Sequence, residues 1–546
     1  MKKTFMFGLL LCCFVLASPS AFSKDHPGKQ NPHNTVIYTD QGSEWSETIR
    51  AAYYSTDQGS RLIPYSWFLA LTQPDGSPFA SDQLSRYGFL PRDADGASIP
   101  VLPVGWMTAI EAGVEQVGIN CSACHTRQIT RGGRSYRIDG GPGIIDFESF
   151  FNDLDAAVRR TLDDPAVFEA FRIATQSPDS DALYEELQAW YEPYHLLISR
   201  SLPQPDMWGL GRVDALSLIF NRIGGLDIGD PSNNYLIPEN ITAADAPVRY
   251  PFLWNSQKQD FTQWAGIAVG GNLTQALSRD LGEVYGVFAT FHPEKDSTQQ
   301  PPVFDYLSDN SANFDGLNTL GVVVSRMGPP RFPWPVNTVL ADRGATVFND
   351  NCTSCHGITQ GEDRPNNDST WATPIRFVET DIRQWQVILR QVDTGVLEGA
   401  TYGDITLGAT ASAADLLAVS VNGAMVQKFP NIDIVTLSGP IIPFRYESRV
   451  MQGIWAAAPY LHNGSVASLE ELLKPSTERM KSFQVGPAYD SQTVGLARSQ
   501  PQGKRYLRET TGCGNIDSGN SNCGHEFGTT LNPADKRALL EYLKTL

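Results

Sequence analysis

Apolar residues recur at helical spacing in several separate stretches of the chain. The clearest stretch runs from Asp146 to Leu162, where aromatic and aliphatic residues return every three or four positions, and Asp163-Asp164-Pro165 stops the pattern. Asn532 and Pro533 suit the first two positions of a last helix, which buries leucines up to Leu546. Similar patterns predict helices over residues 182–191, 337–348, 381–392 and 469–474.

The segments between these stretches carry no sustained periodicity. The 546 residues include 47 Gly and 36 Pro, which break helices and mark turns. We therefore expect a mainly α protein with long loops and few short strands. At about 150 residues per domain, the length favours two or more domains.

The first residues are typical of an export signal. Lys2 and Lys3 precede an apolar run from Phe5 to Ala17, and Ala21-Phe22-Ser23 offers small residues at the cleavage positions. We predict a signal peptide over 1–23 and a periplasmic or secreted protein, with an uncleaved membrane anchor as the alternative. No other apolar run has the about 20 residues needed to cross a bilayer, so no membrane span is expected after cleavage.

Composition and charge exclude several classes of protein. With 41% hydrophobic residues the chain can bury a core, so it is not a disordered protein. It carries 42 Lys and Arg against 60 Asp and Glu, a formal charge of -18. Such an acidic surface repels nucleic acid and anionic lipid, so partners should be neutral or basic, such as a basic redox protein.

Two short cysteine motifs indicate the chemistry. Cys121-Ser122-Ala123-Cys124-His125 and Cys352-Thr353-Ser354-Cys355-His356 are both Cys-x-x-Cys-His, the attachment motif for c-type haem. Two residues between the cysteines put both thiols within reach of the two vinyl groups of one porphyrin, and the adjoining His becomes an iron ligand. The sequence therefore predicts two covalently bound haem c groups, with His125 and His356 as iron ligands.

The same cysteines could instead form disulfides, half of a zinc site or a thioredoxin-like redox pair. A zinc site would need further Cys or His pairs at short spacing, which the sequence lacks. Two copies of the motif with the His attached, in a chain with an export signal, favour haem over all three alternatives.

Cys513 and Cys523 lie in a segment that is rich in Gly, Ser and Asn. In an oxidising compartment we expect a disulfide between them, with two free thiols as the alternative. The disulfide would stiffen the segment that carries His525, two residues after Cys523.

The two haem motifs are far enough apart for each to have its own domain. The segment Pro329-Pro330-Arg331-Phe332-Pro333-Trp334-Pro335 breaks any helix and is typical of a connector between domains. We predict an N-terminal haem domain over 24–335 and a C-terminal haem domain over 336–546.

Three further motifs are Gln263-Trp264-Ala265-Gly266, Pro459-Tyr460-Leu461-His462-Asn463-Gly464-Ser465-Val466 and Gly524-His525-Glu526-Phe527-Gly528-Thr529. With them, most of the chain resembles the bacterial diheme cytochrome c peroxidase superfamily, in the branch that contains MauG-like enzymes and the diheme rubber oxygenase (RoxA-like proteins). The resemblance implies two cytochrome c-like haem domains. The N-terminal haem would be catalytic, with an open face for hydrogen peroxide or dioxygen, and the C-terminal haem would be low-spin and transfer electrons.

The second ligand of the C-terminal haem departs from the peroxidase pattern. The superfamily uses a Met, or a Tyr in the MauG type, at the position where this chain has Ser476, and serine is a poor iron ligand. The rubber oxygenase branch uses a His near the C-terminus, which His525 matches. We expect His356 and His525 to hold this iron. Met480 is the main alternative ligand, and His462 would bond near a propionate or be a structural histidine.

The resemblance also assigns two catalytic residues. Trp264 matches the tryptophan between the two haems, whose indole provides an intermediate orbital for electron transfer, and Trp254 is the runner-up. Glu283 stands where such peroxidases place a glutamate over the open haem face, to take a proton from one peroxide oxygen and return it to the other. The alternative is a solvated helix glutamate. Asn272 or Gln275 could supply a neutral hydrogen bond nearby.

Other polar residues could contact the haems or a metal ion. Arg445, Arg449 and Arg137 are candidates to neutralise haem propionates, with ordinary ion pairs as the alternative. Peroxidases of this superfamily hold calcium between their domains, but no acidic cluster indicates such a site here. The remaining histidines are expected to be exposed or structural: His26, His33, His195, His292.

The preferred hypothesis is a periplasmic diheme peroxidase that reduces hydrogen peroxide at the His125 haem. Electrons would arrive through the His356 haem from a small basic donor, a cytochrome or a cupredoxin. The first alternative is a haem-dependent dioxygenase that cleaves an apolar substrate such as polyisoprene. The second is a diheme cytochrome that only carries electrons.

Overall fold

The computed structural model describes residues 36–92, 102–364, 368–435, 442–500 and 506–546, so the predicted signal peptide lies outside it. Of the described residues, 39% are helical and 18% are in strands. The expectation of a mainly α protein with few short strands is therefore wrong. The fold mixes α and β, with small sheets and ribbons along the whole described chain.

Two β-hairpins that the sequence reading missed flank the first Cys-x-x-Cys-His motif. Each turns on two residues with positive φ, Ala112-Gly113 and Gly132-Gly133, as a tight two-residue turn requires. The Gly-Gly pair between two alternating segments was a usable hairpin signal. The first hairpin pairs β3 (Trp106–Glu111) with β4 (Val114–Ile119), and the second pairs β5 (Thr126–Arg131) with β6 (Arg134–Asp139).

Each hairpin gains a third strand from earlier in the chain. β1 (Val36–Tyr38) runs parallel to β6, and β2 (Ile63–Pro64) runs antiparallel to β4. The other strands of the described chain pair as two-stranded ribbons: β7 (Arg212–Val213) with β8 (Val248–Arg249), β9 (Phe261–Thr262) with β10 (Ala268–Val269), β11 (Glu294–Asp296) with β12 (Val303–Asp305), β13 (Gln360–Arg364) with β14 (Asp368–Trp371), β15 (Ile375–Arg376) with β20 (Tyr446–Glu447), β16 (Gln391–Asp393) with β19 (Thr410–Ser412), β17 (Thr401–Tyr402) with β18 (Ile405–Thr406), β21 (Ser482–Val485) with β24 (Tyr506–Glu509), and β22 (Tyr489–Asp490) with β23 (Gly495–Leu496).

The strongest helix predictions are confirmed. α4 (Phe147–Asp163) is capped by Asp146 and α15 (Pro533–Leu543) by Asn532. α10 (Thr338–Asn351) and α14 (Leu469–Leu472) also form, and the predicted 182–191 helix is part of a longer α6 (Ser180–Ser201). The remaining α-helices are α1 (Glu47–Ser55), α2 (Tyr65–Ala70), α3 (Cys121–Cys124), α5 (Pro165–Ala174), α7 (Ala215–Arg222), α8 (Leu273–Gly286), α9 (Phe314–Ser325), α11 (Thr353–His356), α12 (Arg383–Ile388) and α13 (Ala413–Lys428).

The predicted helix over 381–392 is shorter than expected. Only α12 forms there, because Val392 and its neighbours pair with β19 instead. Among the helices that the structure describes, none combines the length and the apolar character of a bilayer span.

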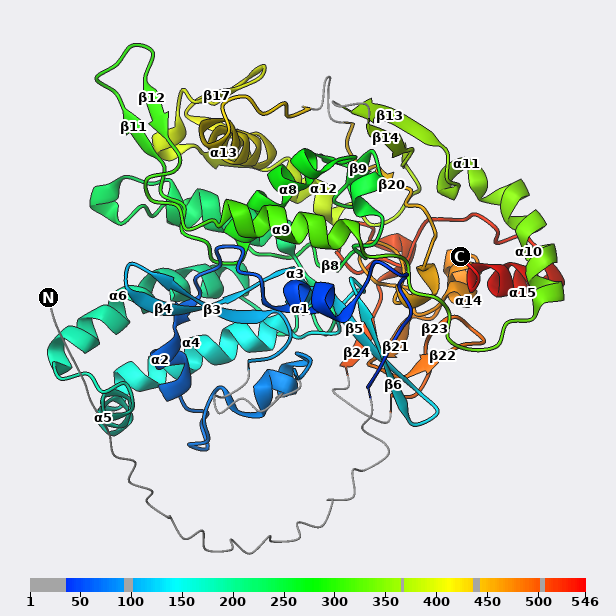
Figure 1. Ribbon diagram of the computed structural model, residues 1–546, viewed down its shortest axis with the longest axis horizontal. Helices are drawn as coiled ribbons and strands as arrows, with labels where there is room; N and C mark the ends of the chain where they lie inside the picture. The colour runs from blue at the N-terminus through cyan, green and yellow to red at the C-terminus, as the bar shows by residue number, and fades with distance from the viewer. Residues whose placement is uncertain (1–35, 93–101, 365–367, 436–441, 501–505) are drawn as a thin grey trace, which may run out of the picture.

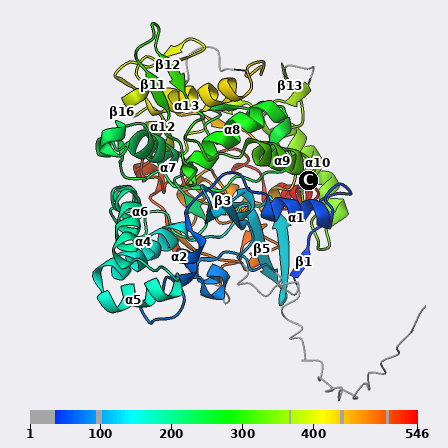
Figure 2. The same cartoon turned by 60° about the vertical axis from the view of Figure 1, so that its left-hand side comes forward.

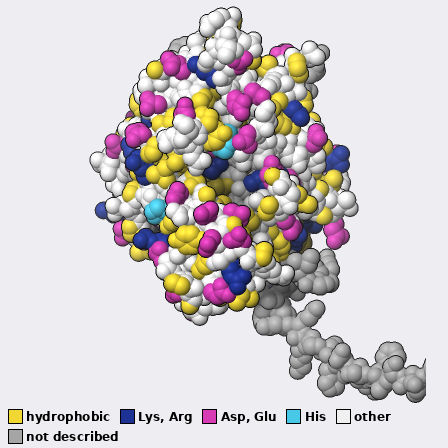
Figure 3. Space-filling view, turned by 90° about the vertical axis from the view of Figure 1, so that its left-hand side faces the viewer, with side chains coloured by type: hydrophobic (Ala, Val, Ile, Leu, Met, Phe, Trp, Pro, Cys, Tyr) yellow, Lys and Arg dark blue, Asp and Glu magenta, His cyan; other side chains and the backbone are white. Residues whose placement is uncertain are grey.

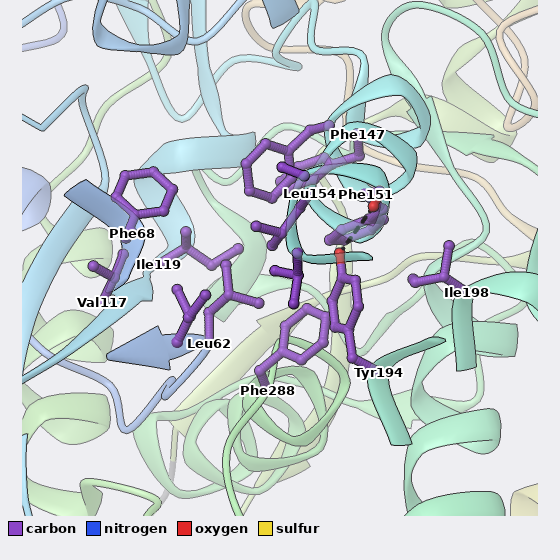
Figure 4. Close-up of a cluster of buried hydrophobic side chains, with 14 of the residues drawn as sticks. Leu62, Phe68, Val117, Ile119, Phe147, Phe151, Leu154, Tyr194, Ile198 and Phe288 are labelled. Carbon is purple, nitrogen blue, oxygen red and sulfur yellow. Dashed lines mark hydrogen bonds between the residues drawn. The ribbon is translucent and has the colours of Figure 1, made fainter. Parts of the chain in front are cut away.

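Three hydrophobic clusters hold the described chain together. In the first, α4 and α6 lie side by side (Figures 1 and 2), and the Tyr194 hydroxyl donates to the carbonyl oxygen of Phe151 at 3.1 Å (Figure 4). The second joins α10 and α15 to β5, β6 and the segment 454–496. The third packs α7, α8, α9, α12 and α13. The second and third clusters thus draw on both sides of residue 335, and the division at that residue stays a prediction.

The proline-rich connector is packed rather than loose. Phe332 and Trp334 meet the ring of Trp455 edge-on, at 5.3 and 5.9 Å between ring centres. Trp455 also donates from its indole nitrogen to the carbonyl oxygen of Pro330 at 2.8 Å. The connector is therefore held against the 454–496 segment.

The close crossing of α10 and α15 positions the second Cys-x-x-Cys-His motif. The two helices lie together at the right of Figure 1, and α10 leads directly into α11, which ends at His356. A Cβ on Gly344 of α10 would come within 2.0 Å of the Ala538 carbonyl oxygen of α15. Only glycine permits this approach of the two backbones.

We expect Gly344→Ala to lower the free energy of unfolding by about 1–3 kcal/mol, because the added methyl group forces the helices apart. Gly321→Ala in α9 is the matched control, since its nearest neighbour would be an ordinary 3.7 Å away. The control should keep or slightly raise stability, as alanine favours helices. Thermal unfolding of both variants checks this, and equal stability of the two would contradict the close crossing.

Candidate haem sites

His356 and His525 face each other across one cavity in the C-terminal part of the chain. His356 ends α11, and His525 lies in the loop that precedes α15. The centres of their imidazole rings are 6.2 Å apart. Cys352 and Cys355 line the same cavity, whose wall is largely apolar. The structure therefore brings the predicted attachment residues and the predicted second ligand together.

This spacing fits an iron ion held between two imidazoles. Two metal–nitrogen bonds of about 2 Å, with the distance from each bonded nitrogen to its ring centre, add up to about 6 Å. His356 donates from Nδ1 to the carbonyl oxygen of Arg449 at 2.8 Å, so Nε2 is left to bind metal. Burial lowers the pKa of His356, and lowers the pKa of His525 to about 3. Both rings are therefore neutral, which is the form that binds metal.

The loop of His525 is fixed from several sides. The expected disulfide between Cys513 and Cys523 is confirmed. The backbone nitrogen of His525 donates to the carbonyl oxygen of Val378 at 2.8 Å, and Arg479 donates to carbonyl oxygens on either side of Cys523. These contacts hold the imidazole of His525 toward the cavity.

The alternative ligands for the second haem either lie outside the cavity wall or contact another side chain. Met480 packs against the second hydrophobic cluster, and among the described residues it is not part of the cavity wall. Ser476 lies 3.3 Å from the sulfur of Cys513. His462 lines the cavity, but its ring stacks on Tyr446 with centres 4.0 Å apart. The geometry favours His525, whose role as ligand stays a prediction.

The first motif is held between the two hairpins. Its cysteines form α3, and the side chain of Asn120 caps that helix by accepting from the backbone nitrogen of Ser122 at 3.0 Å. His125 donates from Nδ1 to the carbonyl oxygen of Pro251 at 2.8 Å, and burial lowers its pKa to about 4. His125 thus presents a neutral ring with a free Nε2, as His356 does.

Glu283 of α8 lies close to the first motif. Burial and the nearby Glu283 charge raise the pKa of the Cys124 thiol to about 12. The side-chain amide of Gln263 donates a hydrogen bond to the Glu283 carboxylate, and burial raises the pKa of Glu283 itself. The sequence indicated Glu283, but its pairing with Gln263 arises only when the loop before α8 folds back. Its catalytic role stays a prediction.

The two amides proposed near Glu283 differ in their surroundings. The Asn272 side chain caps α8 by accepting from the backbone nitrogen of Gln275 at 2.9 Å. Gln275 is buried, and its side-chain nitrogen has no hydrogen-bond partner within the described chain.

Trp264 follows Gln263 and lines the cavity of the second motif. Its indole nitrogen donates to the carbonyl oxygen of Arg249 at 3.1 Å, and the Arg249 guanidinium lies 4.5 Å from the ring centre. Residues 263 and 264 therefore extend from the Glu283 carboxylate to the second cavity. Trp254, the runner-up, is fully buried and stacks on Phe252 with ring centres 4.6 Å apart.

The three arginines proposed for haem propionates lie in different surroundings. Arg449 lines the cavity beside the buried carboxylate of Glu447, which lies 3.5 Å from its Nε, and two of its guanidinium nitrogens make no hydrogen bond in the described chain. Arg137 instead bonds the side chain of Gln128 and the carbonyl oxygen of Pro91. The carbonyl oxygen of Arg445 accepts from the indole of Trp385. Arg449 is the best placed for an anionic group in the cavity.

The sequence does not distinguish a buried arginine from an exposed one, so it could not reveal a second set of four buried arginines. All four donate hydrogen bonds to carbonyl oxygens of the loop 458–464, which overlaps the motif 459–466 described above. Burial lowers the pKa of Arg249 to about 9 and those of Arg127 and Arg212 to about 10. The pairs are Arg127 with Ala458, Arg249 with Leu461, Arg212 with Asn463 and Arg508 with Gly464.

The loop 458–464 is therefore surrounded by buried, positively charged guanidinium groups. Isolated buried cations are costly unless anions or hydrogen bonds offset them. Two nitrogens of Arg127 and one of Arg508 have no partner in the described chain, as at Arg449. Carboxylates such as those of haem propionates would supply the missing acceptors. The donor set thus fits haem.

The remaining histidines have other partners. His195 bonds Asp155 at 2.9 Å, and His292 bonds Asp309 at 2.7 Å, so both have structural contacts. His26 and His33 lie outside the described residues. Within the described ranges, no group of three or more His, Cys, Asp or Glu residues could hold a metal ion such as calcium.

Comparison with known proteins gives a match to the segment that contains the loop 458–464. A family model described as RoxA-like, cytochrome c-like matches residues 445–484. The uncharacterized protein y4iJ of Sinorhizobium fredii is 28% identical over 574 aligned positions, which cover 92% of this chain and 92% of that protein. The uncharacterized protein y4iM of the same organism is 26% identical over 339 positions, which cover 60% of this chain and 63% of that protein.

The family match supports the RoxA-like part of the resemblance. Together with the Cys-x-x-Cys-His motifs, it indicates a haem-dependent oxidoreductase that holds haem c covalently through its cysteines. The resemblance to MauG-like peroxidases stays a prediction.

We expect that replacing both Cys513 and Cys523 with serine lowers the free energy of unfolding by about 2–3 kcal/mol, because the open chain gains conformational freedom. Denaturant unfolding measures the loss. Asp517→Ala, on the exposed part of the same loop, is the control and should stay within about 0.5 kcal/mol of the parent protein. A double-serine variant as stable as this control would contradict the prediction.

Proposed function

We propose that this protein is a periplasmic or secreted diheme peroxidase that reduces hydrogen peroxide at the His125 haem. One observation carries the proposal, which is that the two motifs have unequal surroundings. His356 faces a second imidazole, whereas the charged side chains that act on the thiols of the first motif are Asp280, Glu283 and Arg279. Neither carboxylates nor guanidinium groups are among the axial ligands that haem proteins commonly use, so a small molecule could bind on that side.

A haem iron with one open coordination position supplies the reactivity toward peroxide. The protein contributes the proton transfer. Glu283 would take a proton from one peroxide oxygen and return it to the other, which assists cleavage of the bond between them. The hydrogen bond from Gln263 holds the carboxylate in place. Burial raises the pKa of Glu283, which makes this carboxylate a stronger base toward the peroxide proton than an exposed glutamate.

The second haem would transfer electrons. His356 and His525 would hold the iron of this haem between them and leave no room for a substrate, and the bound haem would supply electron transfer. Trp264 lines that cavity and is adjacent in the chain to Gln263, which bonds Glu283. The proposed division into a catalytic domain over 24–335 and an electron-transfer domain over 336–546 follows these roles.

A small basic cytochrome or cupredoxin would be the electron donor, since the chain carries a formal charge of -18. On the face drawn in Figure 3, acidic side chains are interspersed with basic and apolar ones. On that face the acidic side chains do not gather in one patch, so the attraction of a basic partner would come from the net charge of the whole chain.

His525→Ala should convert the second haem from low-spin to high-spin, because one axial nitrogen ligand is lost. Electron paramagnetic resonance of the oxidised protein measures this. Met480→Leu is the control and should leave the low-spin signal unchanged. A low-spin signal that survives in His525→Ala and disappears in Met480→Leu would instead make Met480 the ligand.

Glu283→Gln should slow the peroxide-induced change of the haem absorption spectrum by about 100-fold or more, because the amide cannot accept the proton. In the parent protein the raised pKa of Glu283 should make the rate fall with decreasing pH, starting at a higher pH than for an exposed glutamate. Stopped-flow mixing with peroxide across pH measures both effects, and Glu294→Gln in β11 is the control. An unchanged rate in Glu283→Gln would contradict the role, and no spectral change in the parent protein would point to an electron carrier.

A haem-dependent dioxygenase for an apolar substrate is the second candidate, and the RoxA-like match favours it. Such an enzyme has less need of an acid–base carboxylate. Cleavage of polyisoprene under oxygen, with no loss of rate in Glu283→Gln, would support the dioxygenase over the peroxidase.

A further inference from the structure

The segment Tyr250-Pro251-Phe252 touches both haem-attachment sites. The Pro251 carbonyl oxygen accepts the hydrogen bond from Nδ1 of His125 at 2.8 Å. Phe252, the next residue, lines the cavity that holds His356 and His525. A single peptide unit therefore separates a group bound to the first histidine from the wall of the second site.

Arg449 links the ring of Phe252 to the second motif histidine, His356. Its guanidinium carbon lies 4.1 Å from the centre of the Phe252 ring. Its own carbonyl oxygen accepts the hydrogen bond from Nδ1 of His356 at 2.8 Å. The two histidines are thus linked through two hydrogen bonds, short stretches of covalent chain and one ring contact.

The ring contact is held in place by its neighbours. Phe252 stacks on Trp254 with an angle of 11° between the planes. Trp254 donates from its indole nitrogen to the carbonyl oxygen of Gln452 at 2.8 Å. Phe252 and Arg449 are both buried, with 2% and 6% of their surface exposed. Buried aromatic and cation–ring contacts of this kind keep a fixed geometry.

We propose that Pro251, Phe252 and Arg449 form an electron path between the two haems, in addition to Trp264. The inference rests on the proposed diheme function. One electron leaves the reduced iron of the His356 site, which is oxidised, and enters the oxidised iron of the His125 site, which is reduced. Electron transfer through bonded atoms and close contacts is faster than through open space, so a continuous path next to both histidines carries the transfer.

Pulse radiolysis of the full-length diheme protein tests the path, because it delivers one electron and follows its redistribution between the haems. Phe252→Leu removes the ring but keeps an apolar side chain. We expect the intramolecular rate to fall about tenfold, equivalent to 1.4 kcal/mol in the barrier. Absorption and resonance spectra should stay unchanged. Phe483→Leu, a buried ring of the second hydrophobic cluster outside the wall of this cavity, is the control and should keep the rate.

A second variant covers the case in which Phe252→Leu does not fold. Arg449→Lys keeps the charge but loses the planar guanidinium over the ring, and it should also slow the transfer. Rates within twofold of the parent protein in every variant that folds would overturn the inference. So would Trp264→Phe abolishing the transfer while these variants leave it intact. A haem assay that finds one haem per chain would refute the diheme function itself, whereas two haems with unchanged rates would refute only this path.

Discussion

The hydrogen bond from Nδ1 of each motif histidine to a backbone carbonyl is the constraint on which both candidate sites depend. A Cys-x-x-Cys-His motif fixes where a porphyrin can be attached, but not which way the imidazole turns. Pro251 holds His125 and Arg449 holds His356, so each ring presents Nε2 to its site in the neutral form that can bind metal. Both acceptors lie far from their motif in the sequence. Packing between distant segments therefore decides how the ligands are oriented.

Buried positive charge is the second organising feature. Arginines from four separate segments converge on carbonyl oxygens of the loop 458–464. Arg449 lies in the neighbouring cavity, where it pairs with Glu447 and keeps two nitrogens that make no hydrogen bond in the described chain. A protein that buries so many guanidinium groups needs acceptors for them. Main-chain oxygens supply some, and the carboxylates of a bound haem would supply others. The same loop lies within the segment that matches the RoxA-like family, so the matched region is the one in which charge and cofactor would meet.

What the sequence predicted correctly was local. The haem motifs need only five adjacent residues, and α4 and α15 are signalled by their own capping residues. The hairpins around the first motif were missed because their apolar alternation is short, although Gly132-Gly133 marked one turn. The partnership of Gln263 with Glu283 and the arginine contacts depend on long-range folding, which no spacing rule encodes. His525 was proposed as a ligand only through the family resemblance, because nothing near it in the chain points to His356.

Under the proposed function, the unequal surroundings of the two motifs require a connection between them. A site with one imidazole and a nearby carboxylate can bind a small oxidant, but it then needs electrons from elsewhere. A site closed by two imidazoles can supply electrons, but it cannot bind the oxidant. Neither arrangement is useful unless the two are coupled, and the coupling must lie in rigid, buried structure to keep its geometry. The residues between the motifs, Phe252, Trp254, Trp264 and Arg449, are all buried, and each contacts another aromatic ring or guanidinium group. The residues between the sites are therefore buried and held in place by their neighbours, as the site residues are.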